Sequence, residues 1–213
     1  MNYTNQKNKT IDGKGVVVKG PIVFLNCSDV VFKNWTINGG NTNLLLQNCV
    51  RCTVDNIICN NAAGPADPFG HGIQLNNCKN CVISHNKIIR CKTSEDGYND
   101  YMGAGNQCLY NAITGHGASK SGNSITIDCK TKNAMISGNI CNPQGGWGGI
   151  VIADGSGHSI VDNSINNCGT GITVCNYYKS KTTNVVLKGN TVVKFTDNIY
   201  WVDKSTTSNI SVT

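Results

Sequence analysis

Residues 82–89 read Val82-Ile83-Ser84-His85-Asn86-Lys87-Ile88-Ile89, in which an apolar pair, two variable residues and an asparagine are followed by a second apolar pair. Related units recur along the chain, with the asparagine at positions 34, 56, 86, 111, 139, 163 and 190. Before each unit comes a short segment that alternates apolar and polar residues, as in Ile73-Gln74-Leu75-Asn76-Asn77-Cys78. Alternation over four or five residues is typical of a short strand.

The spacing of these units is that of a solenoid. Successive asparagines are 22, 30, 25, 28, 24 and 27 residues apart, and a repeat of this length with two or three short strands predicts one turn of a parallel β-solenoid. Turns stacked about 4.8 Å apart place equivalent side chains over one another. We therefore expect a hydrogen-bonded asparagine ladder and an inward stack of cysteines in a coil of about eight turns. Residues 11–193 form the predicted coil, residues 1–10 an N-terminal cap or arm, and residues 194–213 C-terminal strands or a cap.

The composition narrows the class of protein. Of 213 residues, 31 are Asn and 24 are Gly, and there is one Glu, so a helical fold is excluded. The net charge of +6 is carried by scattered lysines without a basic block, which argues against nucleic-acid binding. No apolar run is long enough to span a membrane. The N-terminus shows no secretory signal, and the twelve Cys are predicted to be reduced, buried thiols, so we expect synthesis in a reducing compartment, with a virion as one destination. No cofactor is predicted.

Four stretches of the chain carry a resemblance to a known superfamily. They are Thr10-Ile11-Asp12-Gly13-Lys14-Gly15, Asn26–Asn34, Ser94–Tyr101 and Gly148–Ala153. Together with the repeat from Ile11 to Val193, they resemble the β-helix repeats of pectin-lyase-like proteins. The resemblance implies an all-β, single-stranded, right-handed parallel β-helix. That superfamily includes polysaccharide lyases, glycoside hydrolases, phage tailspikes and non-catalytic virion proteins, so the resemblance implies the fold more narrowly than the function.

The densest polar cluster of the sequence is Lys92–Tyr101. Glycoside hydrolysis needs converging carboxylates, which makes Glu95, Asp96 and Asp100 catalytic candidates, joined by Asp128 or Asp154 from later turns. The alternative is that Asp96-Gly97 forms a turn and Glu95 is a solvated loop residue. The candidate glycan-binding residues are aromatic: Tyr98, Tyr101 and Trp147.

Basic residues and histidines give two further catalytic hypotheses. A lyase needs a base and cations that stabilise an enolate, so Arg90, Lys92 and Asp96 form a candidate lyase set. Gly70-His71-Gly72 and Gly115-His116-Gly117 resemble a tripeptide of polygalacturonase-like hydrolases, which makes His116 a candidate. That family's Asn-x-Asp and paired Asp-Asp are absent from the sequence. The alternative is that both histidines are turn residues, with His71 beginning a strand.

Two Cys-x-x-Cys pairs fall at equivalent places in successive turns. Cys49, Cys52, Cys78 and Cys81 would suit tetrahedral zinc if their sulfurs met. The other eight cysteines occupy repeat positions without such pairing. Stacked, unliganded thiols are therefore the favoured interpretation, and no metal is predicted.

Two function classes compete. The favoured one is a non-catalytic structural or glycan-binding surface protein of the virion spike, decoration or adhesin type, because no complete catalytic set is present. The alternative is a polysaccharide-degrading enzyme, a lyase or glycoside hydrolase, that acts on an acidic glycan in a loop-walled groove. The expected partner is a glycan or a virion or cell-surface polymer, and a homotrimer would fit spike-type relatives.

Overall fold

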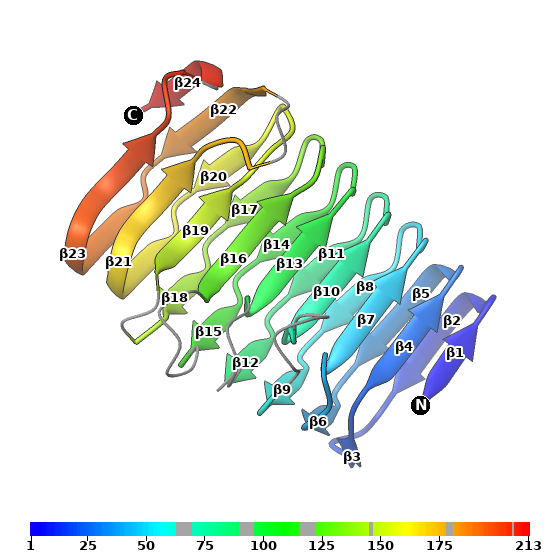
Figure 1. The fold of residues 1–213 in the computed structure, drawn as a ribbon. Helices are drawn as coiled ribbons and strands as arrows, with labels where there is room; N and C mark the ends of the chain where they lie inside the picture. The colour runs from blue at the N-terminus through cyan, green and yellow to red at the C-terminus, as the bar shows by residue number, and fades with distance from the viewer. Residues whose placement is uncertain (63–69, 90–95, 116–121, 145–146, 178–180, 206) are drawn as a thin grey trace.

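The structure is a computed structural model that describes residues 1–62, 70–89, 96–115, 122–144, 147–177, 181–205 and 207–213. Its strands stack in parallel into a right-handed coil of about seven turns, with the two termini at opposite ends (Figure 1). No helix occurs among the described residues, so none there is long and apolar enough to cross a membrane. The predicted fold class is confirmed, with about seven turns in place of about eight.

Each turn contributes one strand to each of three faces, which we name A, B and C. Face A contains β1 (Asn2–Thr4), β4 (Ile22–Leu25), β7 (Leu44–Gln47), β10 (Ile73–Asn76), β13 (Tyr98–Tyr101), β16 (Asn123–Asp128) and β19 (Gly148–Ile152). Face B contains β2 (Lys7–Asp12), β5 (Ser28–Lys33), β8 (Thr53–Asp55), β11 (Val82–Ser84), β14 (Gln107–Leu109), β17 (Met135–Ser137), β20 (Ser159–Val161), β22 (Thr182–Lys188) and β24 (Thr207–Val212). Face C contains β3 (Val17–Lys19), β6 (Thr36–Asn38), β9 (Ile58–Asn60), β12 (Lys87–Ile89), β15 (Ala112–Thr114) and β18 (Ile140–Asn142).

Two long strands join faces A and C near the C-terminal end. β21 (Ser164–Val174) pairs with β18 on face C and with β19 on face A, and β23 (Thr191–Val202) follows it along both faces. Faces A and C therefore form one 15-stranded sheet, while face B is a separate 9-stranded sheet.

The ends of the chain continue these sheets. β1 and β2 pair in parallel with β4 and β5, and β23 and β24 pair in parallel with β21 and β22. The boundary expected at residue 10 falls within β2 and the one expected at residue 194 falls within β23, and the division into caps and coil stays a prediction. The terminal segments are the first and last rungs of the coil.

The core consists of columns of inward side chains, because alternate residues of a strand point to opposite sides of its sheet. One column of face A is buried along its whole length: Ile22, Leu44, Ile73, Tyr98, Ile125, Ile150 and Ile172. A neighbouring column contains Leu46, Leu75, Asp100, Ile127 and Ile152. A carboxylate therefore occupies an apolar position of the core.

The asparagine ladder is present over part of its predicted length. It runs inside the coil through Asn86, Asn111, Asn139, Asn163 and Asn190, and each carboxamide donates to the next at 2.9–3.0 Å. In the preceding turns, Trp35 and Ile57 hold the equivalent inward place, and Ile57 N donates to Asn86 Oδ1 at 2.8 Å, which ends the ladder.

Asn34 and Asn56, which the repeat assigned to this ladder, lie one residue earlier. Both have positive φ (61° and 51°), and they share the turn position that His85 (54°) and Gly138 (65°) occupy in later turns. Asn favours this left-handed conformation, so aligning the repeat on asparagine merged two different positions. Asn56 Nδ2 donates to Asn34 Oδ1 at 2.8 Å, which makes a second, exposed ladder.

Candidate functional site

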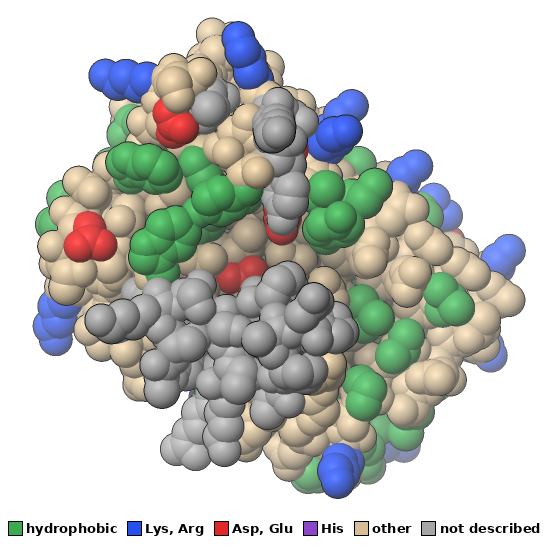
Figure 2. All heavy atoms as spheres, in the orientation of Figure 1, with side chains coloured by type: hydrophobic (Ala, Val, Ile, Leu, Met, Phe, Trp, Pro, Cys, Tyr) green, Lys and Arg blue, Asp and Glu red, His purple; other side chains and the backbone are tan. Residues whose placement is uncertain are grey.

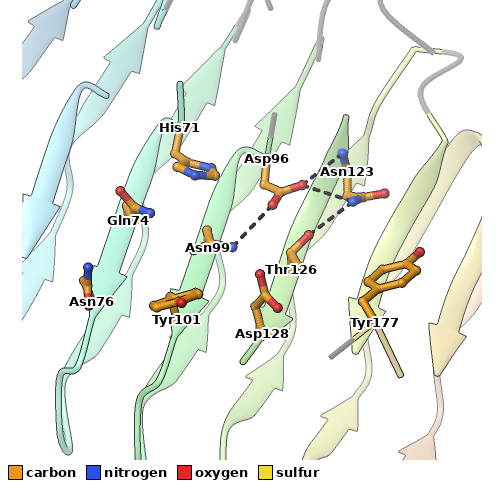
Figure 3. A pocket seen from close by; sticks show the side chains of 10 residues that line it. All are labelled: His71, Gln74, Asn76, Asp96, Asn99, Tyr101, Asn123, Thr126, Asp128 and Tyr177. Atoms are coloured by element: carbon orange, nitrogen blue, oxygen red, sulfur yellow. Dashed lines mark hydrogen bonds between the residues drawn. The ribbon is translucent and has the colours of Figure 1, made fainter. Parts of the chain in front are cut away.

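A cleft of about 530 Å³ lies on face A across β10, β13 and β16. Figure 2 shows acidic side chains at the bottom of a hollow on the face of the molecule that it draws. Its lining comes from three successive turns and from the segment after β21: His71, Gln74, Asn76, Asp96, Asn99, Tyr101, Asn123, Thr126, Asp128 and Tyr177 (Figure 3).

The parallel register arranges this lining in rows. The two outward positions of each strand give the rows Gln74, Asn99, Thr126 and Asn76, Tyr101, Asp128. A third row contains His71 and Asp96, which lie two residues before β10 and β13, and Asn123, the first residue of β16 (Figure 3). Backbone bonds from Gly72 N to Asp96 O and from Gly97 N to Asn123 O join these three positions. Neighbouring strands are about 4.8 Å apart, so each row presents a polar side chain at that interval along the coil axis.

Asp96 is buried at the upper edge of the cleft. Its Oδ1 accepts from Asn123 N at 3.2 Å and from Asn123 Nδ2 at 3.1 Å, and its Oδ2 accepts from Asn99 Nδ2 at 3.5 Å (Figure 3). Burial raises the pKa of Asp96 to about 6, although these donors favour the ionised form. Asp96 can thus carry a proton at mildly acidic pH.

His71 lies beside Asp96 on the preceding turn. Its ring is buried, and burial lowers the pKa of His71 to about 4, so the imidazole is neutral at pH 7. Nδ1 has no hydrogen-bond partner among the described residues. The sequence predicts that His71 begins a strand. In the structure, His71 lies two residues before β10, which starts at Ile73.

Two aromatic rings stand at the C-terminal side of the cleft. Trp147 stacks on Tyr177 with ring centroids 6.3 Å apart, and the two residues are 44% and 48% exposed. Tyr177 N donates to Ala153 O at 3.0 Å, which fixes the segment after β21 against β19. The candidate residue Trp147 therefore lies beside the cleft through Tyr177, a lining residue that the sequence had not indicated.

The other two candidate aromatic residues, Tyr98 and Tyr101, lie on opposite sides of the face A sheet. Tyr101 points outward and lines the cleft. Tyr98 does not reach the cleft, because it occupies the buried core column of face A, and its hydroxyl has no hydrogen-bond partner among the described residues. Strand alternation makes Tyr98 and Tyr101, three positions apart, point to opposite sides of the sheet.

The candidate carboxylates do not converge. Asp100 points into the core, where it accepts from Asn106 Nδ2 at 3.1 and 3.2 Å, and burial raises its pKa to about 7. Asp154 is buried in the turn after β19 and is absent from the cleft lining. Asp128 does line the cleft, but it lies five residues along β16 from Asn123, the row partner of Asp96. At about 3.3 Å per residue, this places the Cα atoms of Asn123 and Asp128 about 16 Å apart along the strand.

The remaining catalytic candidates, Arg90, Lys92, Glu95 and His116, lie outside the described residues. Cys49, Cys52, Cys78 and Cys81 are all buried free thiols. Each donates to a backbone carbonyl oxygen, such as Cys78 Sγ to Leu46 O at 3.4 Å. In the described part of the chain, no group of three or more His, Cys, Asp or Glu side chains is arranged to hold a metal ion.

Several lining residues had not been singled out, namely Gln74, Asn76, Asn99, Asn123 and Thr126. A signal for them was present. The alternation in Ile73–Asn76 and Asn123–Asp128 assigns the apolar residues to the core and therefore the polar ones to the outer face.

Comparison with known proteins identifies the fold. No protein-family model and no curated protein matches the sequence. The tailspike protein of E. coli bacteriophage HK620, in complex with a pentasaccharide, superposes with a TM-score of 0.71 and 10% identity over 98% of this chain and 45% of its own. The polygalacturonase of Erwinia carotovora superposes with a TM-score of 0.63 and 14% identity over 100% of this chain and 72% of its own. The periplasmic alginate epimerase AlgG superposes with a TM-score of 0.61 and 16% identity over 90% of this chain and 47% of its own.

The chain thus has the pectin-lyase-like β-helix fold, as the sequence resemblance implied. It spans about half the length of the epimerase and tailspike structures that it matches. At these identities the comparisons establish the fold alone.

Proposed function

We propose that this protein is a non-catalytic β-helix that binds a glycan chain in the face A cleft, as a surface protein of the virion spike, decoration or adhesin type. The observation that carries the proposal is the cleft floor, where uncharged polar side chains repeat on successive strands and end at the Trp147–Tyr177 pair. A linear glycan lying along the coil axis would meet hydroxyl and amide groups every 4.8 Å or so. Aromatic walls with a few placed polar groups are typical of ligand sites.

The separation of the carboxylates supports binding over cleavage. Retaining and inverting glycosidases hold their two carboxyl groups about 5–9.5 Å apart. The backbone positions of Asp96 and Asp128 are about 16 Å apart along the strand direction, and Asp100 faces the core. The described residues therefore supply one carboxylate toward each end of the cleft.

The tailspike neighbour gives a second line of support. That protein is a β-helix in complex with a pentasaccharide, and the present chain has the same coil and a cleft on its surface. The surface location and the homotrimer stay predictions. Light scattering on the purified protein tests the trimer.

A polysaccharide-degrading enzyme is the second candidate, and Asp96 is the observation that favours it. A carboxyl group with its pKa raised to about 6 can act as a general acid. Neutral His71 beside it is a candidate proton acceptor.

The experiment is a glycan array followed by calorimetry and product assays. We expect wild-type protein to bind at least one oligosaccharide class, and Tyr177→Ala to weaken that binding about tenfold or more. Tyr110→Ala is the matched control, because Tyr110 is 60% exposed and does not line the cleft. Reducing ends or unsaturated products that appear with wild type and vanish in Asp96→Asn would favour the enzyme. Unchanged affinity in Tyr177→Ala would contradict binding in this cleft.

A further inference from the structure

The outward side of face A changes from polar to covered at β19. Val151 of β19 is the register partner of Thr126, and Ala153 follows two residues later on the same side of the sheet. Both side chains are fully buried, and they pack with Cys175, the residue after β21, in an apolar cluster separate from the core. The polar rows of the cleft therefore stop at β16, beside a strand whose outer side is covered.

The segment after β21 forms a wall at this side of the cleft. Cys175 N donates to Ile152 O at 2.9 Å and Tyr177 N donates to Ala153 O at 3.0 Å, so two backbone bonds fix the segment to β19 and the residue that follows it. Figure 3 shows the Tyr177 ring beyond Thr126, on the side of the cleft away from β10. A ligand lying along the coil axis would meet this wall after β16.

The opposite side of the cleft has no such cover on the neighbouring strand. Leu45 and Gln47 of β7 are the register partners of Gln74 and Asn76 of β10, and they continue the same two outward rows. Both are half-buried, as expected for side chains on the outer surface of a sheet. Among the described strands, the rows of the cleft thus continue over β7 and end before β19.

An unpartnered acceptor lies at the closed side. Asn123 Nδ2 donates to Asp96 Oδ1 and to Thr126 Oγ1, which fixes the orientation of the carboxamide. Asn123 Oδ1 is buried and has no hydrogen-bond partner among the described residues. A Cβ atom on Gly148 of β19 would lie 2.7 Å from Oδ1, so glycine at this position leaves room beside the oxygen.

This acceptor distinguishes the end of a glycan chain from its interior. The terminal sugar unit carries a free hydroxyl group where an internal unit carries a glycosidic oxygen. A hydroxyl group can donate to Asn123 Oδ1, whereas a glycosidic oxygen has no proton to donate. A buried acceptor gains more from a donor than from a second acceptor, because an unsatisfied buried oxygen costs free energy.

From this geometry we infer that the face A cleft binds one end of a linear glycan chain, with the terminal unit against Tyr177 and Asn123 and the chain leaving over β7. The inference rests on the proposed function and adds that the recognised structure is a chain terminus. A cleft open at both sides would accept internal stretches of a polymer, because the chain could pass through it. From β10 to the wall the cleft covers about three strand intervals of about 4.8 Å, enough for roughly three hexose units.

The test measures binding stoichiometry on chains of increasing length. Short, medium and long fractions of the polymer whose oligosaccharide binds best on the array are titrated with wild-type protein by calorimetry at pH 7.5. We expect one protein molecule per chain in every fraction, because each linear chain has one terminus of the recognised kind. A number of bound protein molecules that rises with chain length would overturn the inference while the proposed function stands. Failure of every glycan class to bind would overturn both.

End labelling identifies the terminus. A bulky label is attached to the reducing or to the non-reducing end of a chain several times longer than the cleft. One of the two labels is expected to weaken binding about tenfold or more, and the other to leave the affinity unchanged. Unchanged affinity with either label would contradict binding of a chain end.

Gln47→Ala tests where the chain leaves the cleft. This variant is expected to weaken binding of oligomers longer than three units about threefold, through one lost hydrogen bond, and to leave the trisaccharide unaffected. Thr53→Ala is the matched control, because Thr53 is a half-buried outward residue of face B in the same turn. Thermal unfolding checks that both variants are folded. Wild-type affinity of Gln47→Ala for every length would contradict an exit over β7.

Discussion

The carboxamide of Asn139 donates to Asn163 Oδ1 on the next turn at 2.9 Å, with both side chains buried inside the coil. Asn139 Oδ1 in turn accepts from the backbone N–H and the side-chain amide of Asn111 at 2.9 and 3.0 Å. One side chain thereby satisfies polar groups on three successive turns. The ladder holds the turns in register where the face B strands end.

Asn139→Ala is expected to lower the free energy of unfolding by about 2–4 kcal/mol, because the buried Asn111 N–H and its amide lose their acceptor. Chemical denaturation measures the change. Asn60→Ala is the control, since Asn60 belongs to a half-buried pair in which its side-chain amide donates to Asn38 Oδ1 at 2.9 Å. Its cost is expected to be about 1 kcal/mol. Equal costs for the two variants would contradict a structural role of the internal ladder.

The buried carboxyl group of Asp100 predicts stability that falls as pH rises. Burial raises its pKa to about 7, whereas an unfolded Asp titrates near 4. Between these values the folded chain retains a proton that the unfolded chain has lost, so the free energy of unfolding decreases by at most about 4 kcal/mol. Asp100→Asn is expected to abolish this decrease. Urea titrations across the range test it, and parallel curves for variant and wild type would refute the assignment.

The buried histidine His158 predicts the opposite pH dependence, a free energy of unfolding that decreases as pH falls. Its ring is buried, Nδ1 accepts from Ala134 N at 3.3 Å, and burial lowers the pKa of His158 to about 4. The unfolded chain takes up a proton first, so this contribution is intact above about pH 6.5 and is lost as pH falls toward 4.

Asn106 suggests the variant that tests this contribution. Two turns earlier, Asn106 Oδ1 accepts from Cys81 N at 2.9 Å in the same way. His158→Asn is therefore expected to fold and to lose about 2–3 kcal/mol less stability between pH 6.5 and pH 4. The same acid sensitivity in variant and wild type would show that His158 is not responsible.

The thiols predict a pattern of chemical reactivity. Of the eleven described cysteines, ten are buried and Cys129 is partly exposed. Burial raises the pKa of Cys141 to about 12 and that of Cys168 to about 11, which suppresses the reactive thiolate. A thiol reagent applied to the native protein should modify Cys129 first among them, and the others only after unfolding. Peptide mass mapping reads the result, and rapid native modification of Cys49 or Cys78 would contradict the inward stack.

The sequence predicted the coil well because its periodicity reflects the stacking itself. A one-residue error arose at Asn34 and Asn56, because asparagine suits both an internal ladder and a left-handed turn. The same limit affected the candidate site. The sequence treated the cluster Lys92–Tyr101 as one loop, but β13 sends Tyr98 and Asp100 inward and Asn99 and Tyr101 outward.

Tyr177 shows what periodicity cannot predict. It reaches the cleft from a non-repetitive segment, held by a backbone bond to Ala153 that depends on the completed coil. The position of the cleft on face A likewise follows from which strands carry polar outward residues on three adjacent turns. That coincidence appears only once the register of β10, β13 and β16 is known.

The most direct test of the central claim is a crystal structure of the protein with the tightest-binding oligosaccharide from the array. We predict sugar rings lying over β10, β13 and β16, in contact with Tyr101 and Thr126 and ending against Tyr177. An oligosaccharide bound on face B or face C, with the face A cleft holding only water, would contradict the account.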